Sequence, residues 1–222
     1  MNLPAQLFAS DWLWLTNFLF GFFLMHALRH APWRVLLDNS AMVNALVGLL
    51  FGTFLMWQFN AGIRPGFNFH ILGSTLFVLM FGWQIATTAL TLVMLATWLR
   101  MDIGLVTLGL NGLIMIGVPV MFTEGLLRFS KRHLPKNLFL FVLLNGFVCA
   151  GFSIAINVMA TTFTLLILSH YTWAQIQYHY LIPTPILMFT EAFATGMMIT
   201  AFTVAQPNAM MNFSVEEYLT GK

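Results

Sequence analysis

The chain has 222 residues, of which 59% are hydrophobic and only 7% are charged. Soluble domains carry roughly 25% charged residues, so this composition excludes an ordinary water-soluble domain. The few charges leave long stretches with none, namely 12–28, 39–63, 65–99 and 137–190. Because about 20 apolar residues in a helix match the hydrocarbon core of a bilayer, we expect an all-α polytopic protein embedded in a lipid bilayer.

Several other classes of function are excluded by what the sequence lacks. The single cysteine, Cys149, lies in an apolar run, which excludes a disulfide scaffold. The net charge of +2, without basic patches between aromatic residues, excludes nucleic acid as a partner. The sequence has no P-loop, no Ser–His–carboxylate set, no His-Glu-x-x-His motif and no close carboxylate pair. We therefore expect a protein that is not an enzyme and has no permanently bound cofactor.

Seven apolar segments are predicted to be helical, at 12–28, 41–59, 70–81, 83–99, 103–128, 137–168 and 186–206. Whether 70–99 crosses once or twice is decided by the basic residues, because short cytoplasmic loops are rich in Lys and Arg. A hairpin that breaks near Gly82 and Trp83 leaves only Arg64 and Arg100 on the outer side. It collects the others on the inner side: Arg29, Arg34, Arg128, Lys131, Arg132, Lys136 and Lys222.

The prediction is therefore seven transmembrane helices, with the amino terminus outside and the carboxyl terminus inside. Residues 1–206 form one transmembrane domain, and 207–222 form a short cytoplasmic tail. Helix 70–81 would be only about 18 Å long, too short to span alone. Short helices of this kind often mark binding sites in transporters. Segment 137–168 would be about 48 Å long, so it must tilt, protrude or kink.

Gly48 and Gly52 form a G-x-x-x-G motif in the second helix. Small residues at this spacing let two helices approach closely. Two interpretations stay open: packing within this chain, or docking of a partner membrane subunit.

Two ionisable residues are predicted to lie at membrane depth, where burying such a group costs free energy, so each is a candidate for a specific role. His70 begins the short third helix on the outer side. It is either a metal ligand or a histidine at the membrane interface whose hydrogen bonds are satisfied. Glu191 lies in the last helix, as either a hydrogen-bonded carboxyl or a group that serves cation passage or coupling.

Three further polar residues are candidates for supporting roles. Asn111 opens the fifth helix and is expected to tie backbone groups at the adjacent break. His170 and His179 lie in an outer loop, 169–185, whose aromatic residues are typical of an interfacial belt. These two histidines could also guard a metal entrance.

Four short motifs are spread over nearly the whole chain. They are Met-Asn-Leu-Pro at 1–4, Phe-His-Ile-Leu-Gly-Ser at 69–74, Leu-Gly-Leu-Asn at 108–111 and Thr-Glu-Ala-Phe-Ala-Thr-Gly at 190–196. In order and spacing they resemble the substrate-capture components of energy-coupling factor transporters for cobalt and nickel, the CbiM/NikM type. The corresponding motifs of that family are Met-His-Ile-Pro, Gly-His-Leu-Leu-Gly-Gly, Leu-Gly-Ala-Asn and Gly-Glu-Gly-x-x-Thr-Gly.

The resemblance implies a seven-helix bundle of the inner (plasma) membrane whose outer amino terminus plugs into the core. There the terminal amine of Met1, the second residue and the imidazole of His70 would bind Ni²⁺ or Co²⁺ as the substrate. An all-nitrogen ligand set also suits Cu²⁺. Asn2 stands where the family has histidine, and Ile114 where it tends to have a second asparagine.

The resemblance also implies partners: a transmembrane coupling protein and separate ATPase subunits. The leading hypothesis is thus the substrate-binding permease component of such a transporter, with Met1, Asn2 and His70 as metal ligands and Asn111 and Glu191 as supporting or coupling groups. The alternative, motivated by Asn2, is a non-transporting scaffold or assembly factor on the same fold.

Overall fold

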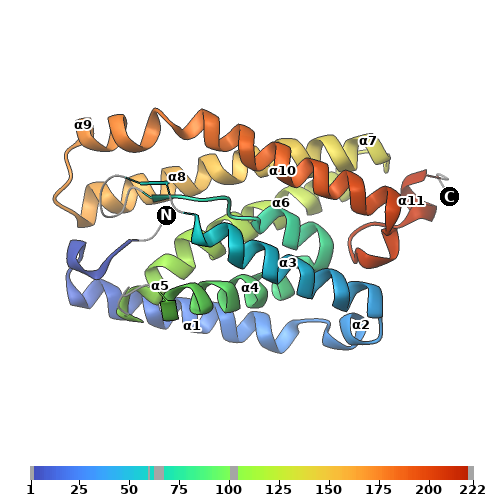
Figure 1. Ribbon diagram of the computed structural model, residues 1–222, viewed down its shortest axis with the longest axis horizontal. Helices are drawn as coiled ribbons and strands as arrows, with labels where there is room; N and C mark the ends of the chain where they lie inside the picture. The colour runs from blue at the N-terminus through green and yellow to red at the C-terminus, as the bar shows by residue number, and fades with distance from the viewer. Residues whose placement is uncertain (1–2, 60, 63–67, 101–104, 220–222) are drawn as a thin grey trace.

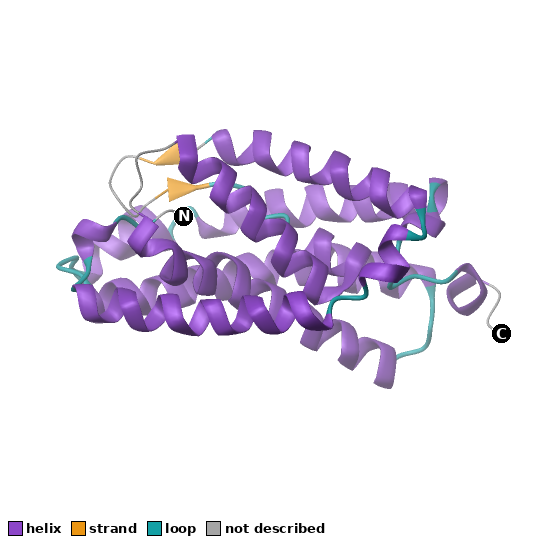
Figure 2. Ribbon diagram, turned by 90° about the horizontal axis from the view of Figure 1, so that it is seen from below, coloured by secondary structure: helices purple, strands orange, loops and turns teal. Residues whose placement is uncertain are grey.

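The computed structural model describes residues 3–59, 61–62, 68–100 and 105–219. Long helices run side by side along the longest axis of the molecule, with a strand pair at one end and the carboxyl-terminal segment at the other (Figures 1 and 2). The helices are α1 (Ser10–His30), α2 (Trp33–Leu37), α3 (Ser40–Gln58), α4 (Ser74–Arg100), α5 (Leu108–Asn111), α6 (Val118–His133), α7 (Leu138–Leu140), α8 (Cys149–Leu168), α9 (Trp173–Ile176), α10 (Thr184–Ala205) and α11 (Val215–Leu219).

The only strands in the described residues are β1 (Ala61–Gly62) and β2 (Asn68–Phe69), which pair antiparallel between α3 and α4. Segments Gly112–Gly117, Phe141–Val148 and Gln177–Leu181 are π-helical. Because the chain stays helical through them, the described residues contain five helical runs long and apolar enough to cross a membrane. These runs are Ser40–Gln58, Ser74–Leu99, Leu105–His133, Leu138–Leu168 and Trp173–Ala205.

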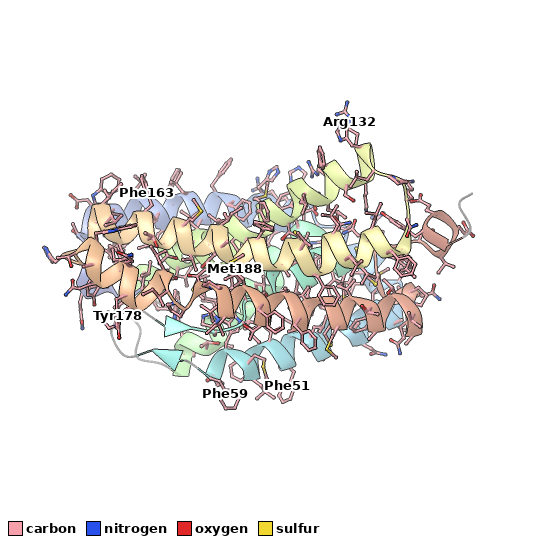
Figure 3. The ribbon with its side chains drawn as sticks, turned by 90° about the horizontal axis from the view of Figure 1, so that it is seen from above. Phe51, Phe59, Arg132, Phe163, Tyr178 and Met188 are labelled. Atoms are coloured by element: carbon pink, nitrogen blue, oxygen red, sulfur yellow. The ribbon has the colours of Figure 1, made fainter. Side chains whose placement is uncertain are left out.

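The outside of the bundle is apolar. Phe51, Phe59 and Phe163 point away from it in Figure 3 and are 63%, 73% and 66% exposed. Large aromatic side chains exposed on this scale are typical of a surface that faces lipid rather than water. The described surface and the five apolar runs therefore agree with the expected membrane protein.

The chain reverses direction at Gly82, inside α4. There φ is 79° and ψ is 161°, which is not helical. At the start of α4, Gly73 lies beside Thr53 near the end of α3. Just after Gly82, the ring of Trp83 stacks on those of Phe23 and His26 near the end of α1. The first limb thus runs antiparallel to α3 and the second antiparallel to α1, so the break lies where the sequence predicted a hairpin.

The last long helix begins earlier than predicted. The sequence suggested a loop up to 185, but residues 173–181 are helical. Thr172 and Gln175 form a capping box that starts this run. The prolines are tolerated because Pro183 and Pro185 lie around the first turn of α10, where a missing N–H leaves no bond unmade.

The core of the bundle contains a polar row on the helical run 138–168. Its members recur at every fourth position and therefore share one face: Asn145, Cys149, Ser153, Asn157 and Thr161, each at most 1% exposed. The Ser153 Oγ lies 3.3 Å from the Ser74 Oγ, and the Asn157 amide donates to the Ile114 carbonyl over 2.6 Å. These bonds join α8 to α4 and to the segment before α6, as polar side chains often do between membrane helices.

Gly48 and Gly52 do not serve packing within the chain. A Cβ added at either position would meet no atom within 4 Å. They lie instead on an open groove of about 590 Å³ between α3 and α10, with Ala45, Ala201 and Ala205 among its lining residues. The first of the two interpretations of the G-x-x-x-G motif is therefore wrong.

The Gly82→Ala variant tests the reversal. The backbone angles at Gly82 lie in a region that is essentially restricted to glycine, and a side chain there costs about 1–3 kcal/mol. We expect the variant to unfold at lower temperature in detergent than the native chain. The matched control is Gly125→Ala, in the helical interior of α6 with nothing near its Cβ, which should be neutral or slightly stabilising. Equal stability of both variants would contradict the assigned break.

Candidate metal centre

His70 lies in the short segment 70–73 between β2 and α4, and its side chain is only 6% exposed. Its Nδ1 is 3.3 Å from the Ile71 carbonyl oxygen, so Nδ1 can carry the ring proton and donate it there. Its Nε2 is buried and has no hydrogen-bond partner among the described residues. A buried polar atom without a partner costs about 1–3 kcal/mol. A metal-binding histidine has this arrangement, with one nitrogen on a backbone carbonyl and the other free for the ion.

The prediction that His70 opens a helix at 70–81 is wrong. The helix begins at Ser74, and residues 70–73 are not helical. Gly73 ends this segment with φ +71°, a backbone conformation that glycine adopts at no steric cost. The short segment holds its shape through contacts from a distant helix instead of through helical hydrogen bonds.

Those contacts come from Glu191 on α10, which is 1% exposed. One carboxylate oxygen accepts the backbone N–H of Leu72 over 2.8 Å, and the other accepts that of Gly73 over 2.7 Å. Two of the backbone donors that precede the first turn of α4 are thus satisfied at membrane depth, where no water is available for them. Through this pair of bonds, Glu191 fixes the segment that carries His70.

The amino-terminal segment enters the bundle in a similar way. Leu3 is fully buried, and its N–H donates to the Asn111 Oδ1 over 2.8 Å. The Asn111 Nδ2 donates back to the Leu3 carbonyl over 3.0 Å and also to the Thr107 carbonyl over 3.0 Å. Asn111 therefore holds the chain two residues after Met1. Met1 and Asn2 themselves lie outside the described residues.

Asn17 on α1 supports this arrangement, and sequence reasoning missed it. Its side chain donates to the Val106 carbonyl over 2.7 Å and accepts the Gly109 N–H over 2.7 Å. A Cβ at Gly109 would run into the backbone of Asn17, so only glycine lets α5 approach α1 so closely. A carboxamide in an otherwise apolar helix is the signal that could have identified Asn17.

The other two predicted histidines lie between α8 and α10. His170 is exposed, in the turn between α8 and α9. His179 lies in a π-helical segment, not in a loop, and its ring contacts that of Tyr178 edge-on. Among the residues that the structure describes, no group of three His, Cys, Asp or Glu side chains is arranged to hold a metal ion. The described part of the centre thus contributes one imidazole, from His70.

The chain is similar to one protein family and to solved structures. Residues 2–209 match the CbiM family, described as the cobalt uptake substrate-specific transmembrane region. A crystal structure of a truncated transition metal transporter has a TM-score of 0.71 at 19% identity, covering 91% of this chain and 98% of its own. A second, of a transition metal transporter, has a TM-score of 0.66 at 18% identity, covering 91% and 92%. No curated protein sequence matches significantly.

Replacing Glu191 by glutamine tests the contact that holds the His70 segment. A carboxamide has one acceptor oxygen, so one of the two backbone N–H groups would face an NH₂ group. Each stranded donor costs about 1–3 kcal/mol, and we expect thermal unfolding in detergent to show a loss of that size. The control is Glu124→Gln, which removes only the i,i+4 pair with Arg128, worth about 0.2–0.5 kcal/mol. Equal stability of the two variants would exclude this role for Glu191.

Proposed function

Since the chain belongs to the CbiM family of cobalt uptake substrate-specific transmembrane regions, we propose that it is the substrate-binding membrane component of an energy-coupling factor-type transporter. Its substrate is an ion of the nickel or cobalt class. The observation that carries the proposal is the Nε2 of His70, buried and without a partner among the described residues. Imidazole nitrogen is a good ligand for both metals.

The amine of Met1 and the backbone or side chain of Asn2 are the further ligands in this proposal. Its support is the neighbouring residue Leu3, which is fully buried and bonded in both directions to Asn111. These bonds hold the chain at the residue that follows Asn2. Glu191 serves as a positioning residue through Leu72 and Gly73. His170 and His179 stay candidates for the metal entrance only.

We also propose that the chain crosses the membrane seven times, with its amino terminus outside and its carboxyl terminus inside. Its support is the distribution of charge. Lys131 donates to Asn212, and Lys136 donates to Glu217 in the carboxyl-terminal segment. Asn39, beside the start of α3, donates to the Asn208 carbonyl. The basic residues after α1 and α6 thus lie at the end of the bundle that holds residues 207–219, as expected for the cytoplasmic side of an inner-membrane protein.

Energy for uptake would come from partners, because the sequence has no P-loop. Separate ATPase subunits would hydrolyse ATP, and a transmembrane coupling protein would transmit the change. We propose that the coupling protein docks on the groove around Gly48 and Gly52. Its support is the open space above both glycines and the small alanine side chains beside them.

A second candidate, a scaffold on the same fold that has lost metal transport, is favoured by one observation. Asn2 stands where the family has histidine, so the chain lacks one imidazole of the expected ligand set. Measuring the metal affinity of the purified chain distinguishes the two candidates, since only the transporter component binds a metal ion tightly by itself.

Replacing His70 by alanine tests the transporter proposal. Mutation of residues that merely support a metal ligand typically costs 10–100-fold in affinity, so loss of a ligand should cost at least roughly tenfold. Calorimetric titration of the purified chain with Ni²⁺ and Co²⁺ measures this, with metal accumulation in cells as the second readout. The control is His133→Ala, at an exposed histidine on α6. If the native chain binds neither metal and cells accumulate nickel, cobalt and copper equally without it, the scaffold is correct instead.

Replacing Gly52 by leucine tests the docking groove. The larger side chain fills open space, so the chain should fold and bind metal as the native protein does, whereas uptake in cells should fall to the level without the protein. Gly125→Leu is the matched control, since its Cβ also meets no atom within 4 Å. Normal uptake by the Gly52 variant would exclude the groove as the docking surface.

A further inference from the structure

Trp57, at the end of α3, contacts the ring of His70. The two ring centroids are 4.8 Å apart, and the planes are tilted by 45°. Both side chains are buried, Trp57 to 2% and His70 to 6% exposure. Each ring carries one buried nitrogen without a hydrogen-bond partner among the described residues, Nε1 of Trp57 and Nε2 of His70. Two unpaired ring nitrogens thus belong to one pair of touching side chains.

These two nitrogens have opposite chemistry. The indole Nε1–H can only donate a hydrogen bond. With the proton of His70 on Nδ1, facing the Ile71 carbonyl, Nε2 offers a lone pair. Although the rings touch, the indole does not donate to the imidazole. The lone pair therefore needs a hydrogen-bond donor or a metal ion, and the N–H needs a hydrogen-bond acceptor.

A metal ion that carries an oxygen ligand of its own meets both needs. The ion accepts the lone pair of His70, and the oxygen accepts the N–H of Trp57. Resting on the proposed function, we propose that Trp57 is a positioning residue that donates a hydrogen bond to an oxygen-donor ligand of the bound ion. This ligand is a water, a hydroxide or a small carboxylate. The substrate is then held as a metal ion with one non-protein ligand, which supplements a ligand set that lacks the second-residue histidine.

The chain contains a matched pair for comparison. Trp83 stacks on His26 with ring centroids 5.8 Å apart, near the end of α1. No nitrogen of either ring is buried without a partner. This second tryptophan–histidine pair has the ring contact but not the unpaired nitrogens, so it separates the effect of the N–H from that of the ring.

The test is titration of the purified full-length chain in detergent with Co²⁺, whose visible absorption reports its ligands. Trp57→Phe keeps an aromatic ring beside His70 and removes the N–H. We expect roughly tenfold weaker binding, the lower end of the range for residues that support metal ligands, together with a shifted absorption band. Trp83→Phe should match the native chain in both. Added acetate should strengthen Co²⁺ binding by the native chain if the oxygen-donor ligand is a carboxylate. It should leave Co²⁺ binding unchanged if that ligand is water or hydroxide. In either case Trp57→Phe binds Co²⁺ more weakly than the native chain.

Native affinity and an unshifted band in Trp57→Phe would overturn the inference and leave the proposed function standing. Failure of the native chain to bind Co²⁺, Ni²⁺ or any other divalent metal would overturn both. If Trp57→Phe does not fold, the native chain with ¹⁵N-labelled indoles is loaded with Zn²⁺ instead. One indole N–H resonance should then shift, and it should be one that remains in Trp83→Phe. No shift would overturn the inference.

Discussion

The candidate metal centre depends on a carboxylate that binds backbone instead of a cation. The two carboxylate oxygens of Glu191 accept hydrogen bonds from the N–H groups of Leu72 and Gly73. These two residues lie more than a hundred positions earlier in the chain. Inside a bilayer every such N–H must find a partner within the protein. This bond pair therefore allows a non-helical segment to lie buried in a helical bundle, and that segment presents His70 with one nitrogen unpaired.

Near the amino terminus, carboxamide side chains provide the hydrogen-bond partners of buried backbone groups. Asn111 pairs with both backbone groups of Leu3, and Asn17 pairs with those of Val106 and Gly109. The irregular backbone at this end of the bundle is thus held by acceptors and donors from helices far away in sequence. An irregular segment whose backbone N–H and C=O groups are hydrogen-bonded can be buried and still hold a fixed conformation. A metal site needs ligands that are held in this way.

Much of the fold could be predicted from the sequence, because the apolar runs and the basic residues carry strong signals. The break at Gly82 followed from charge placement, and the structure has it at that residue. The start of the last helical run was predicted too late, at 186, because the capping box of Thr172 and Gln175 was not recognised. The centre was only partly predictable. His70 was identified as the residue of interest, but the contact of Trp57 and the partners of Glu191 arise from tertiary packing, which no local pattern encodes.

The proposed function requires that the unpaired nitrogen of His70 ligates the transported ion. A crystal structure of the native chain loaded with Ni²⁺, with anomalous scattering recorded at the nickel edge, tests it most directly. We expect one strong anomalous peak at bonding distance from Nε2 of His70, with Nδ1 still facing the Ile71 carbonyl. A peak at another histidine, or full occupancy elsewhere with His70 unbound, would contradict it.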